Sequence, residues 1–248
     1  MKIKTFLIIS ALFLALASCK KAPLTIGKTI VQHRELKPFS TLVVNNDINL
    51  ALVRDDSCYI EISAGENIID NITTVVDNGI LTIKNDNKIS WIRTYDYRID
   101  ATLHFTDINK LIFSACGELR TKNQFNAEGS HYTIEIYDGS GDIFMELNNC
   151  ENLEVNYRYG TSQLNLFGEG NKFLNIYKKS YGLIHAENYV ADSVAITNQS
   201  TGDCWVKADE YLHSRIEHLG NIYYNGEPEI VEEYGEDARG RLIRLLGD

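Results

Sequence analysis

A short pattern recurs through the second half of the chain at intervals of about twenty residues, and it limits the possible folds more than any other feature. In each copy a small residue is followed two positions later by an aliphatic residue or a cysteine. The small residues are Gly117, Gly141, Ser162, Gly182, Gly202 and Gly220, and the residues two positions later are Leu119, Ile143, Leu164, Ile184, Cys204 and Ile222. A fixed period of this length is typical of a solenoid, in which each turn buries its apolar side against the next.

A second run of alternating apolar residues precedes most copies at about the same pitch. Its apolar pairs are Ile134 and Ile136, Leu153 and Val155, Leu174 and Ile176, and Val194 and Ile196. Because alternate side chains of a strand point to the same side, each repeat supplies two strands with inward rows. We therefore predict an all-β chain folded as a right-handed parallel β-helix with rungs of about 20 residues. A two-sheet sandwich is the alternative.

The segments before and after the repeats are less regular. Residues 58 to 108 resemble a meander, with a turn at Asp77-Asn78-Gly79 that is typical of a hairpin. We expect them to form an irregular N-terminal β cap on the solenoid. Acidic residues dominate 227–237, and arginines alternate with leucines and an isoleucine in 239–246. We expect this last segment to cover the open end, since an uncovered β-helix leaves a free strand edge.

The N-terminus has the features of a lipoprotein signal peptide. Lys2 and Lys4 precede an apolar run from Phe6 to Leu16, and the sequence Leu-Ala-Ser-Cys ends at Cys19. An apolar run this short is removed during secretion and does not persist as a membrane span. We predict a signal peptide over 1–18, lipidation at Cys19, a lipidated tether over 19–38 and a single domain over 39–248. An ordinary secretory signal with a chance cysteine is the alternative.

Charge and position restrict the partners. Removal of residues 1–18 takes away two lysines, which moves the formal net charge from −10 to −12. An acidic surface repels phosphates, so we expect no nucleic acid partner. The lipid would anchor the protein in the outer membrane. Because Lys20 and Lys21 follow the anchor where a surface-export signal would be acidic, both a cell-surface and a periplasm-facing position remain open.

Three segments resemble one known family. They are Phe39 to Leu50, with Asp47 where the family more often has glycine, Glu66 to Ile83, and Gly220 to Pro228. In order and spacing the chain resembles the secreted head GIN domain proteins of Bacteroidota, the putative auto-transporter adhesins. The resemblance implies a β-helical extracytoplasmic domain with an adhesive or binding role. It implies no reaction and supplies no catalytic residues.

The residues themselves give little support for catalysis, cofactors or metals. Asp138, Asp142 and Asp203 lie where tight turns favour aspartate, and the histidines have no metal-ligand spacing. Lys178-Lys179 and Arg158 would form the base of a lyase only if a folded corner joined them. We therefore expect a lipoprotein that binds a glycan or protein ligand without catalysis. A pectinase- or lyase-like β-helix enzyme is the alternative, and a purely structural envelope protein is the third possibility.

One outward row suggests where a ligand binds. Phe144, Trp205 and Tyr223 fall between inward positions of successive repeats, so they should point outward from one side of the solenoid. Such a stripe stacks on sugar rings or forms the centre of a protein interface. Outward aromatic residues also stabilise neighbouring strands by packing across them, which is the alternative role.

Overall fold

The structure is a computed structural model that describes residues 25–87, 98–123, 125–127 and 129–245. The predicted signal peptide and Cys19 lie outside the described residues. Within the described ranges, no helix is long and apolar enough to cross a membrane.

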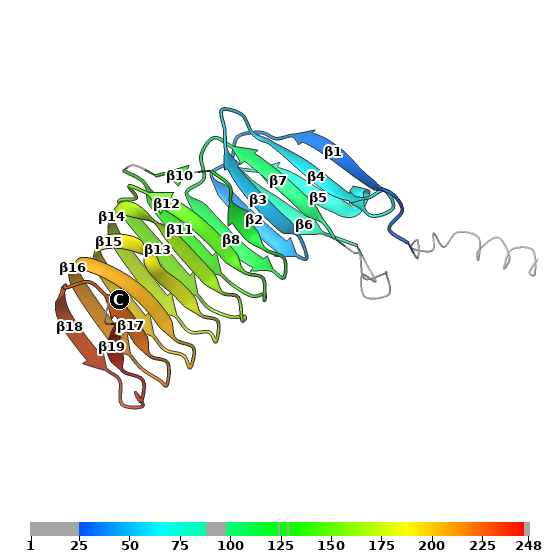
Figure 1. Ribbon diagram of the computed structural model, residues 1–248. Helices are drawn as coiled ribbons and strands as arrows, with labels where there is room; N and C mark the ends of the chain where they lie inside the picture. The colour runs from blue at the N-terminus through cyan, green and yellow to red at the C-terminus, as the bar shows by residue number, and fades with distance from the viewer. Residues whose placement is uncertain (1–24, 88–97, 124, 128, 246–248) are drawn as a thin grey trace, which may run out of the picture.

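The described chain consists almost entirely of β-strands, with one short 3-10 turn at Ile69–Asn71. The strands are β1 (Thr29–Glu35), β2 (Thr41–Asn46), β3 (Asn49–Arg54), β4 (Tyr59–Gly65), β5 (Ile72–Asp77), β6 (Ile80–Asn85), β7 (Asp100–Phe105), β8 (Lys110–Ala115), β9 (Leu119–Thr121), β10 (Phe125–Asn126), β11 (His131–Ile136), β12 (Ile143–Asn148), β13 (Asn152–Tyr157), β14 (Leu164–Lys178), β15 (Ile184–Asn198), β16 (Cys204–Ile216), β17 (Ile222–Asn225), β18 (Glu229–Tyr234) and β19 (Leu242–Arg244). They form an elongated right-handed β-solenoid of about six turns with rungs of about 21 residues, as predicted (Figure 1).

Two ladders of parallel strands run along the solenoid. We call one the front face, formed by β2, β8, β11, β13, the later halves of β14, β15 and β16, and β18. The back face consists of β3, β9, β12, the first halves of β14 to β16, β17 and β19. Each strand hydrogen-bonds to the turns before and after it, so the two faces share one narrow core.

The inward rows predicted from the repeat form this core. On the back face Leu164 lies beside Ile184, and Ile184 beside Cys204, so one turn there takes 20 residues. On the front face Val155, Ile176 and Ile196 are stacked in the same way and are buried. Stacking like residues at a fixed spacing supplies the hydrophobic burial that a single turn lacks.

The repeating small residues have a packing role at the corner that leads from the front face to the back face. We call this the glycine corner; it comprises residues 137–142, 158–163, 179–183, 199–203 and 217–221. A Cβ atom added to Gly220 would strike the carbonyl oxygen of Gly202, and one added to Gly141 would strike that of Gly117. Successive turns approach so closely here that a side chain larger than that of glycine requires the backbone to move.

The N-terminal cap extends the two parallel ladders by one strand each and then adds antiparallel strands. Strands β6 and β7 pair in parallel with β2 and β3, whereas β4 and β5 pair antiparallel with β7 and β6. The turn between β5 and β6 has Asn78 and Gly79 at φ angles of 48° and 77°, as a two-residue hairpin requires. The predicted irregular β cap is thus present.

The predicted tether over 19–38 is too long. Strand β1 (Thr29–Glu35) pairs antiparallel with β4 along its whole length, so this segment belongs to the folded domain. Its side chains are mostly exposed. An edge strand that buries little of either face lacks the alternation of apolar residues by which a strand is recognised.

The C-terminal segment forms the final strands of the solenoid, which cover the edges of β16 and β17 and leave β18 exposed. Strand β18 pairs with β16 and β19 pairs with β17, both in parallel, and β18 is exposed along its length. Glu232 lies beside the buried Ser214, at a position that points inward in the preceding turn. An inward-pointing charge on a free edge opposes pairing with another strand.

We expect Gly220→Ala to lower the free energy of unfolding by about 1–3 kcal/mol, because the new methyl group is forced against the Gly202 carbonyl. Urea unfolding followed by circular dichroism measures this change. The control is Gly235→Ala, where the added Cβ comes no nearer than 3.2 Å to any atom of Glu217, whereas the one added at Gly220 strikes the Gly202 carbonyl oxygen. Equal stability of the two variants would contradict the packing role of the glycine corner.

Candidate functional site

The outward aromatic row predicted on the back face is present in the structure. Register places Arg120 beside Phe144, and His185, Trp205 and Tyr223 on consecutive turns. These side chains are half-buried. Asn165 separates Phe144 from His185, so the aromatic row has two parts.

The rings of this row stack on one another. Trp205 is sandwiched between His185, at a centroid distance of 4.5 Å, and Tyr223, at 5.1 Å, with interplanar angles of 9° and 10°. The guanidinium of Arg120 lies 4.4 Å from the centroid of Phe144. Both faces of Trp205 are thus occupied within the molecule, which leaves the ring edges for a ligand. The assignment of Phe144, Trp205 and Tyr223 as ligand contacts stays a prediction.

Of the polar residues considered for catalysis, Arg158 and Lys179 come together on successive turns of one corner, whereas Lys178 does not join them. Asp203 accepts a hydrogen bond from the backbone of Asn221 at 2.7 Å, and Asp138 accepts one from Gly139 at 2.8 Å, both of which are turn contacts. Lys178 points into the core, where its Nζ donates to Ser200 Oγ at 2.7 Å and burial lowers its pKa. Among the described residues, no group of three potential ligands could hold a metal ion.

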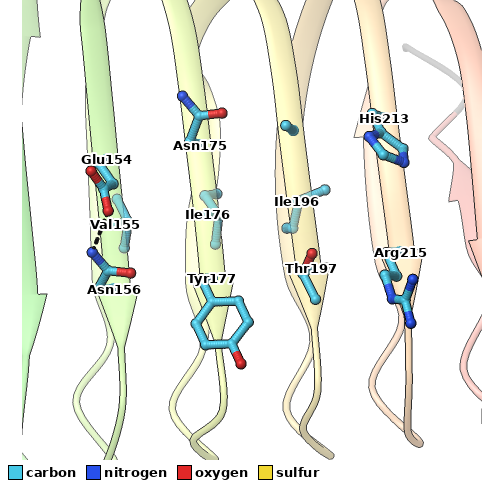
Figure 2. Close-up of a pocket in the computed structure, with 11 residues that line it drawn as sticks. Glu154, Val155, Asn156, Asn175, Ile176, Tyr177, Ile196, Thr197, His213 and Arg215 are labelled. Atoms are coloured by element: carbon cyan, nitrogen blue, oxygen red, sulfur yellow. Dashed lines mark hydrogen bonds between the residues drawn. The ribbon is translucent and has the colours of Figure 1, made fainter. Parts of the chain in front are cut away.

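A groove on the front face could hold a ligand. It has a volume of about 250 Å³ and is lined by residues of β13, β14, β15 and β16. Figure 2 shows its side chains on these four neighbouring strands. Ala195 and Thr197 form its floor along β15, because they are smaller than their neighbours in the two outward rows.

Larger side chains form the two walls of the groove. On β14, Asn175 and Tyr177 lie beside Ala195 and Thr197, and on β16, His213 and Arg215 lie on the other side (Figure 2). The floor is therefore bordered by an aromatic ring and by amide, imidazole and guanidinium groups.

Hydrogen bonds hold these walls in position. The hydroxyl of Tyr177 donates to Gln199 at 2.9 Å, and Asn175 Nδ2 donates to Asn152 at 2.7 Å. Arg215 donates from Nε to Glu217 at 2.7 Å, which raises the pKa of the arginine. Side chains fixed in this way lose less conformational entropy when a ligand binds.

The carboxylate next to the β16 wall is held in its charged form. His213 Nε2 and Arg215 Nη1 both lie 3.1 Å from the carboxylate of Glu233 and donate to it. The hydrogen bond from His213 is the main cause that lowers the pKa of Glu233. The bonded histidine and arginine therefore keep fixed orientations along the groove.

The groove residues are typical of reversible binding. Glu154 is the single carboxylate among its lining residues, and it accepts a hydrogen bond from Asn156 at 2.6 Å. Glycosidic hydrolysis ordinarily uses two carboxyl groups on either side of the bond. The hydroxyl of Thr197 bonds to no other described residue, so it is available to a ligand together with the face of Tyr177.

Small residues at two outward positions of the sequence correspond to this groove, although the outward aromatic row is the more conspicuous pattern. Once the register of the second strand is written out, Ala195 and Thr197 stand between larger outward residues in consecutive repeats. His213, one of the histidines without metal-ligand spacing, forms part of a groove wall.

Comparison with known families gives a match over most of the domain. The model of a family described as putative auto-transporter adhesin, head GIN domain, matches residues 38–228. No curated protein matches the chain.

Several solved structures share the fold at low sequence identity. A putative adhesin from Bacteroides fragilis is 19% identical with a TM-score of 0.77, covering 89% of this chain and 99% of that one. A putative lipid binding protein from Parabacteroides distasonis is 16% identical with a TM-score of 0.66, covering 88% and 97%. A putative adhesin from the same organism is also 16% identical, with a TM-score of 0.57 and coverage of 88% and 98%. At these identities the likeness establishes the fold alone.

We expect Trp205→Ala to lower the free energy of unfolding by about 1–3 kcal/mol, because two stacked ring pairs are lost. Thermal and urea unfolding measure the loss. Tyr181→Ala is the control, since that ring is 69% exposed and should change stability by about 0.5 kcal/mol or less. A stable Trp205→Ala variant that fails to bind polysaccharide would assign the row to ligand contact instead.

Proposed function

The chain belongs to the family of putative auto-transporter adhesins with a head GIN domain, and from this premise we propose that it is a cell-envelope lipoprotein that binds an extended glycan. The ligand lies in the front-face groove, and no bond in it is broken. The lipid on Cys19 anchors the protein in the outer membrane.

The observation that supports this proposal is the form of the groove. Its floor of Ala195 and Thr197 follows the direction of β15, and its walls offer polar groups at regular strand spacing. A chain of sugar rings presents hydroxyl groups at regular intervals and has flat apolar faces that stack on an aromatic ring such as Tyr177. Polar groups placed around a small apolar surface are typical of ligand sites.

The sequence and the groove both favour binding over catalysis. A hydrolase needs a second carboxyl group opposite Glu154, and the groove lining does not supply one. The adhesin names of two structural neighbours agree with a binding role. One neighbour is named as a lipid binding protein, so phospholipid vesicles are included in the binding assay as a competing ligand.

We expect Thr197→Trp to weaken polysaccharide binding roughly tenfold or more, because an indole on the groove floor occupies the space between Tyr177 and Arg215. An array of immobilised neutral and acidic polysaccharides measures the binding. The control is Ala51→Trp, a similar enlargement at a half-buried outward position of the back face. Unchanged binding by Thr197→Trp, or binding to vesicles alone, would refute the groove as a glycan site.

The anchor is tested in cells. We expect the wild-type protein in the membrane fraction and the Cys19→Ala variant in the soluble fraction, because the lipid chains supply the membrane attachment. Protease treatment of intact cells should digest the anchored domain if it acts as an adhesin. Protection until the outer membrane is permeabilised would place the domain in the periplasm and contradict the adhesive role.

A further inference from the structure

Four tyrosines and two cations lie where the front face meets the glycine corner, and two of the rings, those of Tyr137 and Tyr177, contact a cation. Tyr159 and Tyr181 are 67% and 69% exposed, and Tyr137 and Tyr177 are 39% and 37% exposed. Tyr177 also forms part of the groove wall. The cluster is therefore an extension of the groove, and we call it the tyrosine corner.

Arg158 and Lys179 lie on successive turns within the tyrosine corner. The backbone of Arg158 bonds to Ile136 in the turn before, and that of Lys179 bonds to Tyr157 in the same manner. The Arg158 guanidinium lies 5.5 Å from the ring centroid of Tyr137, and the Lys179 ammonium lies 5.1 Å from that of Tyr177. A hydrogen bond with Tyr177 is the main cause that raises the pKa of Lys179, so the ammonium stays charged.

Neither cation forms an ion pair with a residue that the structure describes, although the protein has an excess of acidic residues. Two other solenoid lysines are paired by contrast: Lys110 with Glu135 at 2.9 Å, and Lys172 with Glu151 at 2.9 Å. Asp138 is an exposed acidic residue directly after Tyr137 in the sequence, and its Oδ1 accepts the backbone hydrogen bond of Gly139. Like charges on neighbouring strands repel each other, so two such cations are better accommodated when an external anion lies between them.

We propose that the tyrosine corner binds the anionic groups of an acidic polysaccharide, with Arg158 and Lys179 on its carboxylates or sulfates and the tyrosine rings against its sugar faces. This inference rests on the glycan-binding function proposed for the groove and specifies the charge of that ligand. Guanidinium and ammonium groups form charge-assisted hydrogen bonds with such anions, and tyrosine adds both a ring face and a hydroxyl.

The arrangement favours a polysaccharide over other polyanions. Nucleic acid carries a phosphate on every nucleotide and needs many cations along its path, whereas this site has two in an acidic protein. A polysaccharide with spaced charges needs few cations and gains the rest of its affinity from hydroxyl and ring contacts. The groove and the tyrosine corner together supply both kinds of contact.

Three probes with one backbone test the charge preference: dextran, carboxymethyl-dextran and dextran sulfate, each titrated into the purified protein. We expect tighter binding of the two charged polymers and a loss of this preference as salt rises. The double variant Arg158→Gln/Lys179→Gln should bind the charged polymers roughly tenfold more weakly or worse while binding dextran as before. The control Lys122→Gln/Lys172→Gln removes the same charge elsewhere on the surface and should bind like the wild type.

The outcomes separate this inference from the function on which it rests. Equal binding of all three polymers, reduced by Thr197→Trp, would overturn the anionic preference and leave the glycan function standing. No binding to any of them or to the polysaccharide array would overturn both. Polyglutamate or anionic phospholipid vesicles binding as tightly as carboxymethyl-dextran, with the same loss in the double variant, would overturn the polysaccharide as the ligand.

Discussion

The close approach of successive turns at the glycine corner determines most of this structure. Gly141 and Gly220 each lie where a Cβ would strike the carbonyl of the turn before, so the backbones there stack in a fixed register. Since the turns remain in step, each position of the repeat becomes a continuous row along the solenoid. The core and the aromatic stack are rows of this kind, and the groove lies where two outward rows pass through Ala195 and Thr197, so a shift in register at the corner would displace all three together.

The two faces use their outward rows differently. On the back face, the large flat rings of His185, Trp205 and Tyr223 are neighbours and stack on one another. On the front face, small side chains at Ala195 and Thr197 interrupt rows of larger ones and leave a depression. The groove that we propose as a binding site thus arises by omitting side-chain volume, without the inserted loops on which many scaffolds place their functional residues.

The sequence predicted the solenoid well because its rows repeat with the strand period. The inward residues around Leu164, Ile184 and Cys204 were all assigned correctly, since burial demands apolar residues there in every turn. Strand β1 was missed because hydrogen bonds to β4, and not buried side chains, hold it in place. The groove was missed because it depends on two small outward side chains, Ala195 and Thr197. Outward positions accept residues of any size, so small residues there do not by themselves indicate a groove. The contact between Arg158, Lys179 and the tyrosines depends on the corner conformation, which spacing alone does not give.

The exposed last turn determines whether a second molecule can extend the solenoid and lengthen the groove. Glu232 continues the inward row of Ser214, so a second molecule that extended the solenoid from β18 would bury a carboxylate whose hydrogen-bond donor in this structure is Tyr234. Each molecule then presents one groove of fixed length. With the lipid anchor and the polysaccharide ligand that we propose, strong attachment to a long polymer would depend on how densely neighbouring molecules are anchored, and avidity would rise with the amount of protein in the membrane.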